Sequence, residues 1–328
     1  MPSPLAGAHP SDLTAQPGRP AEQPGRPDAQ PGEPTTAAPP LTGELRLRIA
    51  RRGGRSTAVE QFHVGSLRVL RAYYAPPARP YAPPARPNED ATGQPIFTVV
   101  NPGGGYLGGD AYATEIMVEE GASALLTTQS ATKVYRTPQG PALATQRFEL
   151  GPRSRLESVP DSLIAYRDAS YRQDTLVDMA PDASLALAEV VTHGWSPDGE
   201  PFRFDEVSLV TRVRVGGRLA VADNLLIRPG EGGAGPLMLG GRTHVGSLLV
   251  VDPRADDGAV VALRALLAAR CPSPPAGPLV GVTRLAVPGF ALRALADSTQ
   301  GAEAVLRSAL DWMRAEWHGL PPIDLRKL

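Results

Sequence analysis

Cysteine, lysine and long apolar runs are all scarce in this 328-residue chain. Its one cysteine, Cys271, cannot form an internal disulfide, and a metal site made of cysteines alone is excluded. No apolar run reaches the roughly 18 residues that a membrane-spanning helix needs. The amino-terminal region also lacks the charged, apolar and small-residue regions of a secretory signal. We therefore expect a cytoplasmic protein with no membrane partner.

Excess charge of either sign is absent as well. The formal net charge is −1, so no basic field attracts nucleic acid, and no nucleic-acid partner is expected. The basic residues are nearly all arginine, and only Lys133 and Lys327 are lysines. Two explanations are open for the lysine at position 133. The position needs a compact ammonium group, or the lysine forms an ordinary salt bridge.

Proline is abundant and concentrates in two places. Residues 1–40 are rich in Pro, Gly, Ala and Gln, a composition that buries too little apolar surface to offset chain entropy, so we predict a disordered tail. Residues 74–95 contain the heptapeptide Tyr-Ala-Pro-Pro-Ala-Arg-Pro twice in succession. We interpret this segment as an inserted surface loop, with a polyproline ligand for a partner as the alternative. Residues 41–328 are expected to form one β domain.

Strand signals dominate from residue 43 onward. Leu45, Leu47 and Ile49 alternate with polar residues, which is the two-residue period of a half-buried strand. Many short strands separated by turn sequences predict a mainly β fold, either a sandwich, a barrel or a stack of sheets. Further strands are expected at residues 67–69, 96–100, 113–118, 123–129, 146–150, 156–159, 175–179, 185–192, 207–215, 218–226, 247–251 and 279–286.

Two helices are predicted near the carboxyl end. Residues 256–271 carry apolar side chains at helical spacing, and Pro272 follows as a stop. Residues 301–317 repeat the pattern with a wide apolar face, and Gly319 then terminates the helix. Because strand and helix alternate here, both helices are expected on one side of the β structure.

The most unusual segment is the glycine-rich run at residues 101–110, Asn-Pro-Gly-Gly-Gly-Tyr-Leu-Gly-Gly-Asp. Gly103, Gly105 and Gly108 match the G-x-G-x-x-G pattern of dinucleotide-binding proteins. That interpretation requires a helix after the glycines, because the helix amino terminus binds the pyrophosphate. Residues 111–118 alternate like a strand instead, which disfavours nucleotide binding.

A second unusual segment follows at residues 125–136, Leu-Leu-Thr-Thr-Gln-Ser-Ala-Thr-Lys-Val-Tyr-Arg. Together the two segments resemble the signature pair of the UreD (UreH) family of urease accessory proteins. The segments at residues 156–164 and 168–173 are also similar to that family. The positions that match the family motifs are Asn101, Gly103, Gly104, Gly108, Gly109, Asp110, Thr127, Thr128, Gln129, Lys133, Tyr135, Pro160, Tyr171, Gly199 and Glu200.

The chain departs from the family pattern at Trp195. The family commonly has Gly-Arg-x-x-x-Gly-Glu at this point, where the chain has Gly194, Trp195 and then Gly199-Glu200. A role that belongs to that arginine is therefore absent or relocated, while Glu200 keeps the match.

The resemblance implies a helically stacked β-sheet fold with two C-terminal α-helices. It also implies a protein that is not an enzyme, and that binds apo-urease and the accessory proteins F and G while nickel passes into urease. No tightly bound cofactor is expected, only nickel in transit, since the five histidines are scattered in sequence and form no cluster with the single cysteine. Asp110 and Glu200 are the leading candidates for transient nickel contact, ahead of Asp168 and Asp174. A turn-capping or salt-bridged carboxylate is the alternative role for each.

Two other functions stay open at this stage. One is a pure interaction scaffold that never contacts the metal, because scaffolding and conduction predict the same partners. The other is a nucleotide-using or hydrolytic enzyme built on the glycine-rich loop, although no Gly-x-Ser-x-Gly or His-x-x-x-His motif accompanies it.

Overall fold

The computed structural model describes residues 40–74, 93–232, 236–271, 277–323 and 325. All of them belong to the second of two compact units in the chain, Pro39–Leu328. The tail predicted at residues 1–40 lies outside the described residues except for Pro40. Of the predicted insertion at residues 74–95, Tyr74 and Pro95 belong to strands, and residues 75–92 lie outside the described residues.

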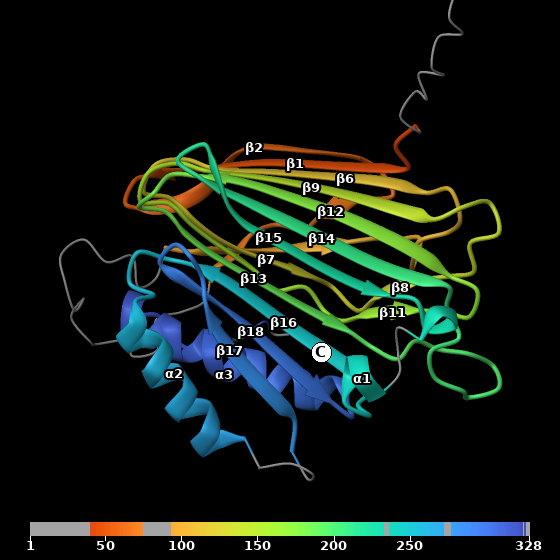
Figure 1. Ribbon diagram of the computed structural model, residues 1–328. Helices are drawn as coiled ribbons and strands as arrows, with labels where there is room; N and C mark the ends of the chain where they lie inside the picture. Colours follow the sequence, from red (N-terminus) through yellow and green to blue (C-terminus); the bar gives the residue numbers. More distant parts are fainter. Residues whose placement is uncertain (1–39, 75–92, 233–235, 272–276, 324, 326–328) are drawn as a thin grey trace, which may run out of the picture. The chain divides into compact units, whose positions relative to one another are not determined.

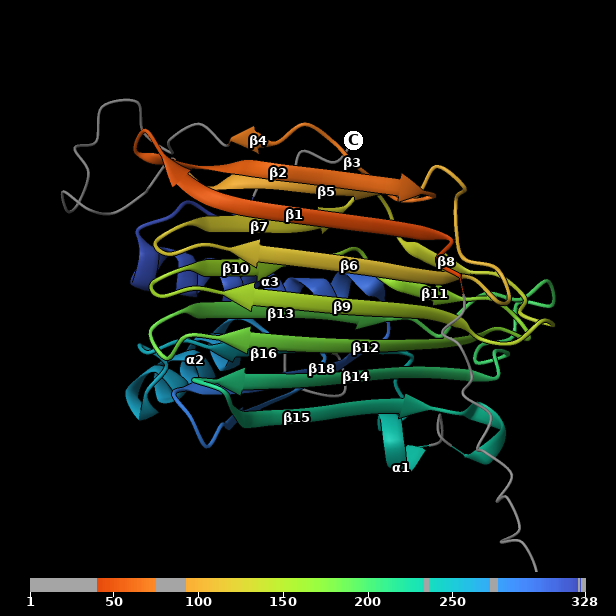
Figure 2. The same ribbon diagram turned by 90° about the horizontal axis from the view of Figure 1, so that it is seen from above.

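Two β-sheets lie face to face, and the chain passes repeatedly from one to the other (Figure 1). Figure 2 shows the strands of the seven-stranded sheet side by side. Its order is β15 (Arg218–Ile227), β14 (Glu206–Val215), β12 (Ser170–Met179), β9 (Ala142–Leu150), β6 (Ala111–Val118), β1 (Gly43–Arg52) and β2 (Arg55–Gly65).

The second sheet has eleven strands. Its main order is β17 (Leu279–Arg284), β18 (Gly289–Ala296), β16 (His244–Val251), β13 (Ser184–Val191), β10 (Arg155–Ser158), β7 (Ser123–Thr128), β5 (Pro95–Val100) and β3 (Arg68–Val69). Off this path, β4 (Tyr73–Tyr74) pairs with β5, and β11 (Leu163–Ala165) pairs with β13 and with β8 (Thr132–Val134).

The central strands form parallel coils. From β5 to β14 the chain alternates between the sheets, so each coil adds a strand to both, and neighbouring coils pair in parallel. Antiparallel strands flank the parallel part of each sheet. In the smaller sheet these are β2 and β15; in the larger they are β3 and β4 on one side and β16, β18 and β17 on the other. The predicted mainly β, helically stacked fold is thus confirmed.

The helices α2 (Asp257–Arg270) and α3 (Thr299–His318) cover the outer face of the eleven-stranded sheet (Figure 1). Asp256 caps α2 by accepting a hydrogen bond from the amide of Ala259, and Ser298 caps α3 in the same way. Both predicted helices, and their placement on one side, are confirmed. The sequence did not predict the short elements η1 (Pro229–Glu231) and α1 (Pro236–Leu239). Among the described residues no helix is long and apolar enough to cross a bilayer.

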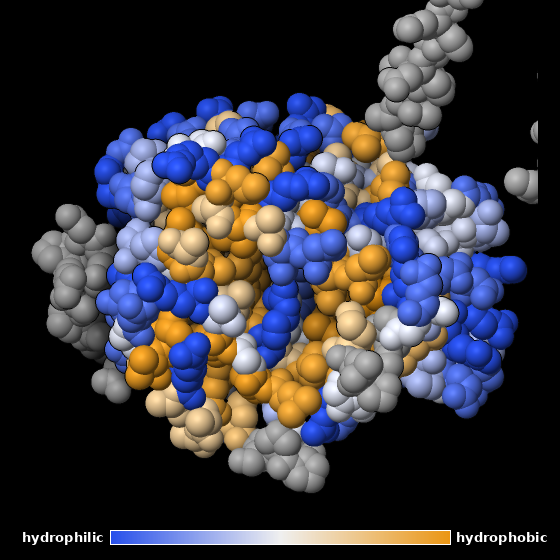
Figure 3. All heavy atoms as spheres, in the orientation of Figure 1, coloured by the Kyte–Doolittle hydropathy of each residue, from blue (hydrophilic) through white to orange (hydrophobic). Residues whose placement is uncertain are grey.

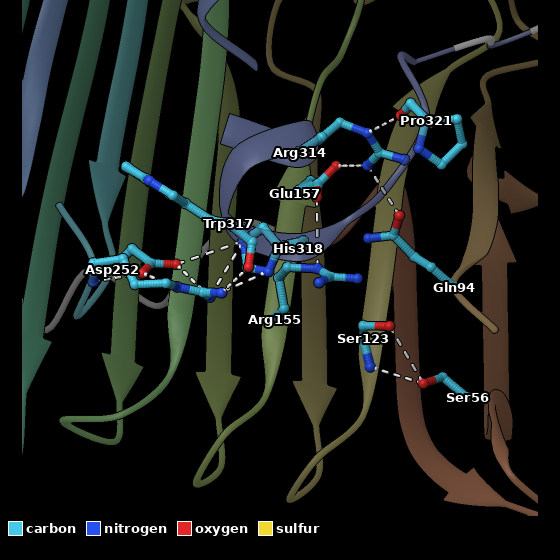
Figure 4. A network of polar contacts seen from close by, with 11 residues as sticks. Ser56, Gln94, Ser123, Arg155, Glu157, Asp252, Arg314, Trp317, His318 and Pro321 are labelled. Atoms are coloured by element: carbon cyan, nitrogen blue, oxygen red, sulfur yellow. Dashed lines mark hydrogen bonds and ion pairs between the residues drawn. The ribbon is translucent and has the colours of Figure 1, made fainter. Parts of the chain in front are cut away.

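A buried ionic network attaches α3 to the sheet beneath it (Figure 4). The Arg314 guanidinium pairs with Glu157 in β10 and also donates to the side chain of Gln94 at 3.0 Å. Both charged side chains are less than a tenth exposed. Because a buried charge without a partner is costly, this pair fixes where the helix sits on the sheet.

Apolar side chains fill three regions. One core lies between the two sheets, the second lies between the eleven-stranded sheet and the helices, and the third lies toward the end of the sandwich where β6, β9, β12 and β14 begin. This end is called the loop end below, because the glycine-rich loop and the loops that follow β8, β11 and β13 meet there.

Candidate functional site

The glycine-rich loop, residues 101–110, connects β5 to β6 at the loop end. Its backbone stacks on the second family motif, since the amide of Tyr106 donates to the Lys133 carbonyl at 2.8 Å and the amide of Tyr135 donates to the Tyr106 carbonyl at 2.9 Å. A Cβ atom at Gly105 would lie 2.8 Å from the Lys133 carbonyl oxygen, so only glycine allows this approach. The strand β6 follows the loop, which agrees with the argument against a dinucleotide site.

Asp110 ends this loop with its carboxylate fully engaged. The carboxylate accepts hydrogen bonds from the Thr42 hydroxyl at 3.1 Å, the Leu107 amide at 2.8 Å and the Tyr112 hydroxyl at 3.1 Å. Three donors on one carboxylate are typical of a side chain that fixes a turn. Turn capping, the alternative raised for Asp110 from the sequence, accounts for all of these contacts.

The second motif lies where the pairing of the eleven-stranded sheet is interrupted. Residues 129–131 separate β7 from β8, and residues 159–162 separate β10 from β11. The Thr127 hydroxyl donates to the Val159 carbonyl at 2.7 Å, and the Thr128 hydroxyl accepts from the Asp161 amide at 2.9 Å. The threonines therefore replace backbone pairing across the interruption, and they bring the second motif next to Pro160.

A polar row crosses the inner face of the seven-stranded sheet. The parallel register aligns Thr114, Gln146, Thr175 and Thr211 across four strands. The adjoining row on one side is entirely apolar, consisting of Ile116, Phe148, Val177 and Val213. The polar row thus borders an apolar part of the interior.

A matching row lies on the eleven-stranded sheet, where Glu189, Ser247 and Arg293 are aligned. Gln173 joins the two sheets, because its amide nitrogen donates to the Glu189 carboxylate and lies 3.4 Å from the Thr175 hydroxyl. Burial raises the pKa of Glu189 to about 7, an effect that the hydrogen bond from Gln173 opposes. An internal carboxyl group that titrates near neutral pH is characteristic of functional sites.

A cavity of about 110 Å³ lies between the sheets, and its polar lining includes Thr114, Gln146, Gln173, Thr175 and Glu189. It has room for several water molecules, since one needs roughly 10–15 Å³. The motif residues Thr127, Thr128, Pro160 and Tyr171 all line it.

Two further hollows share part of this lining. A hollow of about 60 Å³ lies beside the glycine-rich loop and shares Tyr106, Thr128 and Thr132 with the cavity between the sheets. The rest of its lining includes Asn101, Gly104, Gln129 and Lys133. A larger hollow of about 360 Å³ lies against α3 and shares Pro160, Asp161 and Glu189. Neighbouring hollows thus share lining residues, in order from the family motifs, past Glu189, to the helix face. We call them together the polar passage.

The two polar rows meet at the edge of the sandwich formed by β15, where the two sheets are joined by an ion pair. Asp223 in β15 lies in register with Thr211, and both of its carboxylate oxygens accept from the Arg293 guanidinium at 2.6 Å. This pair links the two sheets. Figure 3 shows apolar surface interspersed with polar groups along this side, where the edge strands β15 and β17 face the viewer.

Gly199 and Glu200 lie elsewhere, in an exposed turn between β13 and β14. The backbone of Glu200 is fixed by hydrogen bonds to Ser196 and Asp198. Neither Asp110 nor Glu200 lines the polar passage. Trp195, at the family's arginine position, is 52% exposed and packs on the Tyr166 ring at 4.9 Å between centroids.

The remaining motif positions lie in or beside the loop. Gly103 donates its amide to the Asn101 side chain at 2.9 Å, and Gly109 donates to the Gly140 carbonyl at 3.1 Å. The backbone of Gly108 approaches Thr137, and Tyr135 packs on Tyr166. Asp168 and Asp174, the weaker candidates, form ion pairs with Arg136 and Arg212.

Sequence reasoning missed the groups that matter most in this arrangement. Glu189 has no unusual local sequence. Asp161 and Gln173 fall within the family-like segments 156–164 and 168–173, but they were not named as site residues. Strand register and the interrupted pairing bring the three together. Within the described residues, no group of three or more His, Cys, Asp or Glu side chains is placed to hold a metal ion.

Comparison with known proteins agrees with the motifs. Residues 41–327 match the family model described as UreD urease accessory protein. The chain is 48% identical to the urease accessory protein UreD of Actinomyces naeslundii, over 87% of this chain and 98% of that protein. It is 43% identical to UreD of Paenarthrobacter aurescens (87% and 94% covered) and 30% identical to UreD of Lachnoclostridium phytofermentans (87% and 98% covered). The chain belongs to the UreD family of urease accessory proteins.

Proposed function

We propose that this protein helps to load apo-urease with nickel, in a complex with the accessory proteins F and G, and that Ni²⁺ moves through the polar passage. The relatives carry the name urease accessory protein, which supports a role beside urease rather than an enzymatic one. The observation that carries the conduit part is Glu189, a carboxyl group that lines a cavity with room for several water molecules between two apolar cores.

The donors of the passage suit a metal that must move on. Hydroxyl, amide and carboxylate oxygens hold Ni²⁺ more weakly than imidazole or thiolate groups do. The carboxylates at Asp161 and Glu189 both line the shared part of the passage, so an ion has successive oxygen ligands.

Protonation offers a means of release. A carboxylate must lose its proton to bind a metal ion, and the pKa of Glu189 is raised to about 7. At neutral pH a proton therefore competes with the ion for this group. The ion is bound briefly and then displaced, which is what delivery to a tighter site requires.

Two alternatives predict different outcomes. A pure scaffold would hold apo-urease and the other accessory proteins without touching nickel, so the passage residues would not matter. An enzyme built on the glycine-rich loop is disfavoured because β6, and not a helix, follows that loop.

The test is urease activation in cells that express the structural subunits with the accessory proteins, with and without this chain. Nickel per urease active site is measured by mass spectrometry at ordinary nickel concentrations. Deletion of the chain should leave urease expressed but poor in nickel. Full nickel loading without the chain would refute the proposed function as a whole.

Single variants then separate conduit from scaffold. Glu189→Gln should lower nickel content while co-purification with apo-urease and accessory protein F stays normal. Glu115→Gln removes an exposed carboxylate on β6 and is the matched control, with no expected effect. Asp110→Asn and Glu200→Gln test the two carboxylates expected from the sequence, each of which we propose for transient nickel contact. Normal loading with all three of the Glu189, Asp110 and Glu200 variants would leave only the scaffold.

A further inference from the structure

Two of the histidines that are scattered in sequence lie together at the loop end. His193 comes two residues after β13, and His244 begins β16, the antiparallel neighbour of β13. Their ring centroids are 5.3 Å apart, with the ring planes at 90°. The strand pairing brings the two imidazoles together although 51 positions separate them in the sequence.

We propose that His193 and His244 form a binding site for one divalent transition-metal ion, with water completing its coordination. With a metal–nitrogen bond of about 2.1 Å, two imidazoles on adjacent positions of one ion have centroids roughly 4.5–5.3 Å apart. The observed separation falls at the upper end of that range. Imidazole is a preferred ligand of Ni²⁺, Cu²⁺ and Zn²⁺.

The ring nitrogens support a ligand role. The Nδ1 atom of His193 is shielded from solvent and has no hydrogen-bond partner among the described residues. A buried polar atom left in this state costs about 1–3 kcal/mol, so a metal ion bound there would remove a penalty. The Nδ1 atom of His244 lies 2.8 Å from the Thr243 hydroxyl. If Nδ1 carries the proton and donates it to that oxygen, Nε2 keeps its lone pair and the ring is held in orientation.

The charged groups around the pair act in both directions. Burial and the neighbouring His193 ring lower the pKa of His244, because both disfavour a positive charge there. Asp297 acts on His244 as a nearby negative charge. Since Asp297 is paired with Arg242, it is not counted as a ligand. His193 is half-buried while His244 is buried, so an ion reaches the pair from the solvent side of His193.

The proposal that this pair binds a metal ion depends only on the geometry of the two histidines. A role for the pair in nickel delivery rests, in addition, on the proposed function. Only two protein ligands are present, so the ion would exchange more readily than in a closed site with four ligands. That property fits a collecting site at the surface better than a structural one.

The experiment uses the full chain and NiCl₂ as the probe. Binding is measured by equilibrium dialysis, and the number of coordinated imidazoles is measured by X-ray absorption. Wild type should bind one Ni²⁺ with two imidazole nitrogens. His193→Gln should weaken binding at least tenfold, and His63→Gln, which removes an imidazole from β2, should not. His193→Cys should keep binding and add a sulfur-to-nickel charge-transfer band, which a purely structural histidine would not produce.

Each outcome decides the proposal. Equal Ni²⁺ affinity in wild type, His193→Gln and His244→Gln would overturn it, as would an absorption spectrum without imidazole ligands. If these results appear while Glu189→Gln still lowers urease nickel content, the site is refuted and the proposed function stands. If the pair binds Ni²⁺ while deletion of the chain leaves urease fully loaded, the site stands and the proposed function is refuted.

Discussion

Replacing Glu189 by glutamine should stabilise the protein, and by more at high pH than at low pH. Folding raises the pKa of this carboxyl group from 4.5 to about 7, chiefly because burial disfavours its charged form. Between these values the folded state holds a proton that the unfolded state has lost. The free energy of unfolding therefore falls as pH rises from about 4.5 to about 7, and the penalty is complete above that range.

The size of the effect follows from the shift. At about 1.36 kcal/mol for each pKa unit, the charged form costs about 3 kcal/mol at pH 8 and about 1 kcal/mol at pH 5. The glutamine variant avoids this cost. Its side-chain oxygen can still accept the hydrogen bond from Gln173, and its amide group faces a cavity with room for water.

Urea-induced unfolding at pH 5 and pH 8, followed by tryptophan fluorescence, measures both values. Glu115→Gln is the control, since it removes the same charge from the exposed face of β6 and should change stability by less than about 0.5 kcal/mol. An equal gain at the two pH values, or a loss of stability at pH 8, would refute the assignment of a raised pKa to Glu189.

Two further changes test the attachment of α3 and the motif loop. Arg314→Met should cost about 3–5 kcal/mol in unfolding free energy, because Glu157 stays buried without its main partner. Adding Glu157→Gln to this variant should recover most of the loss. A smaller loss that the second substitution does not recover would contradict the buried pair. Gly105→Ala should cost about 1–3 kcal/mol, because its Cβ would lie 2.8 Å from the Lys133 carbonyl oxygen, whereas Gly281→Ala on β17 has nothing within 4 Å and should not. Urea unfolding measures both changes, and equal effects of the two glycine substitutions would contradict the packing argument.

Local periodicity was enough to predict most strands and both long helices. Strands such as β1 and β14 have one buried face, so apolar and polar residues alternate in the sequence. The long strand β2 was missed because most of its residues are exposed and its apolar side chains show no consistent face. The strand β18 was also missed, although its buried residues alternate, because the predicted strand at residues 279–286 was followed directly by the last helix.

The candidate site was predicted only in part. The motif resemblance identified Thr127, Thr128, Pro160 and Tyr171, all of which line the cavity. Glu189 was not recognised, since a single acidic residue in an apolar strand does not reveal which face it occupies or what lies opposite. Its position follows from register between strands distant in sequence, and local patterns do not contain that information.

The parallel coils also constrain how the length of the chain can change during evolution. Side chains alternate between faces along a strand, so one residue inserted within β9 or β12 would move Gln146 or Thr175 to the outer face and interrupt the polar row. The duplicated proline-rich heptapeptide lies ahead of β5, where the first coil begins. A seven-residue duplication at that point leaves the register of every later coil unchanged. We therefore expect insertions and deletions among relatives to occur between β4 and β5 and in the loops, and to be rare within the strands of the coils.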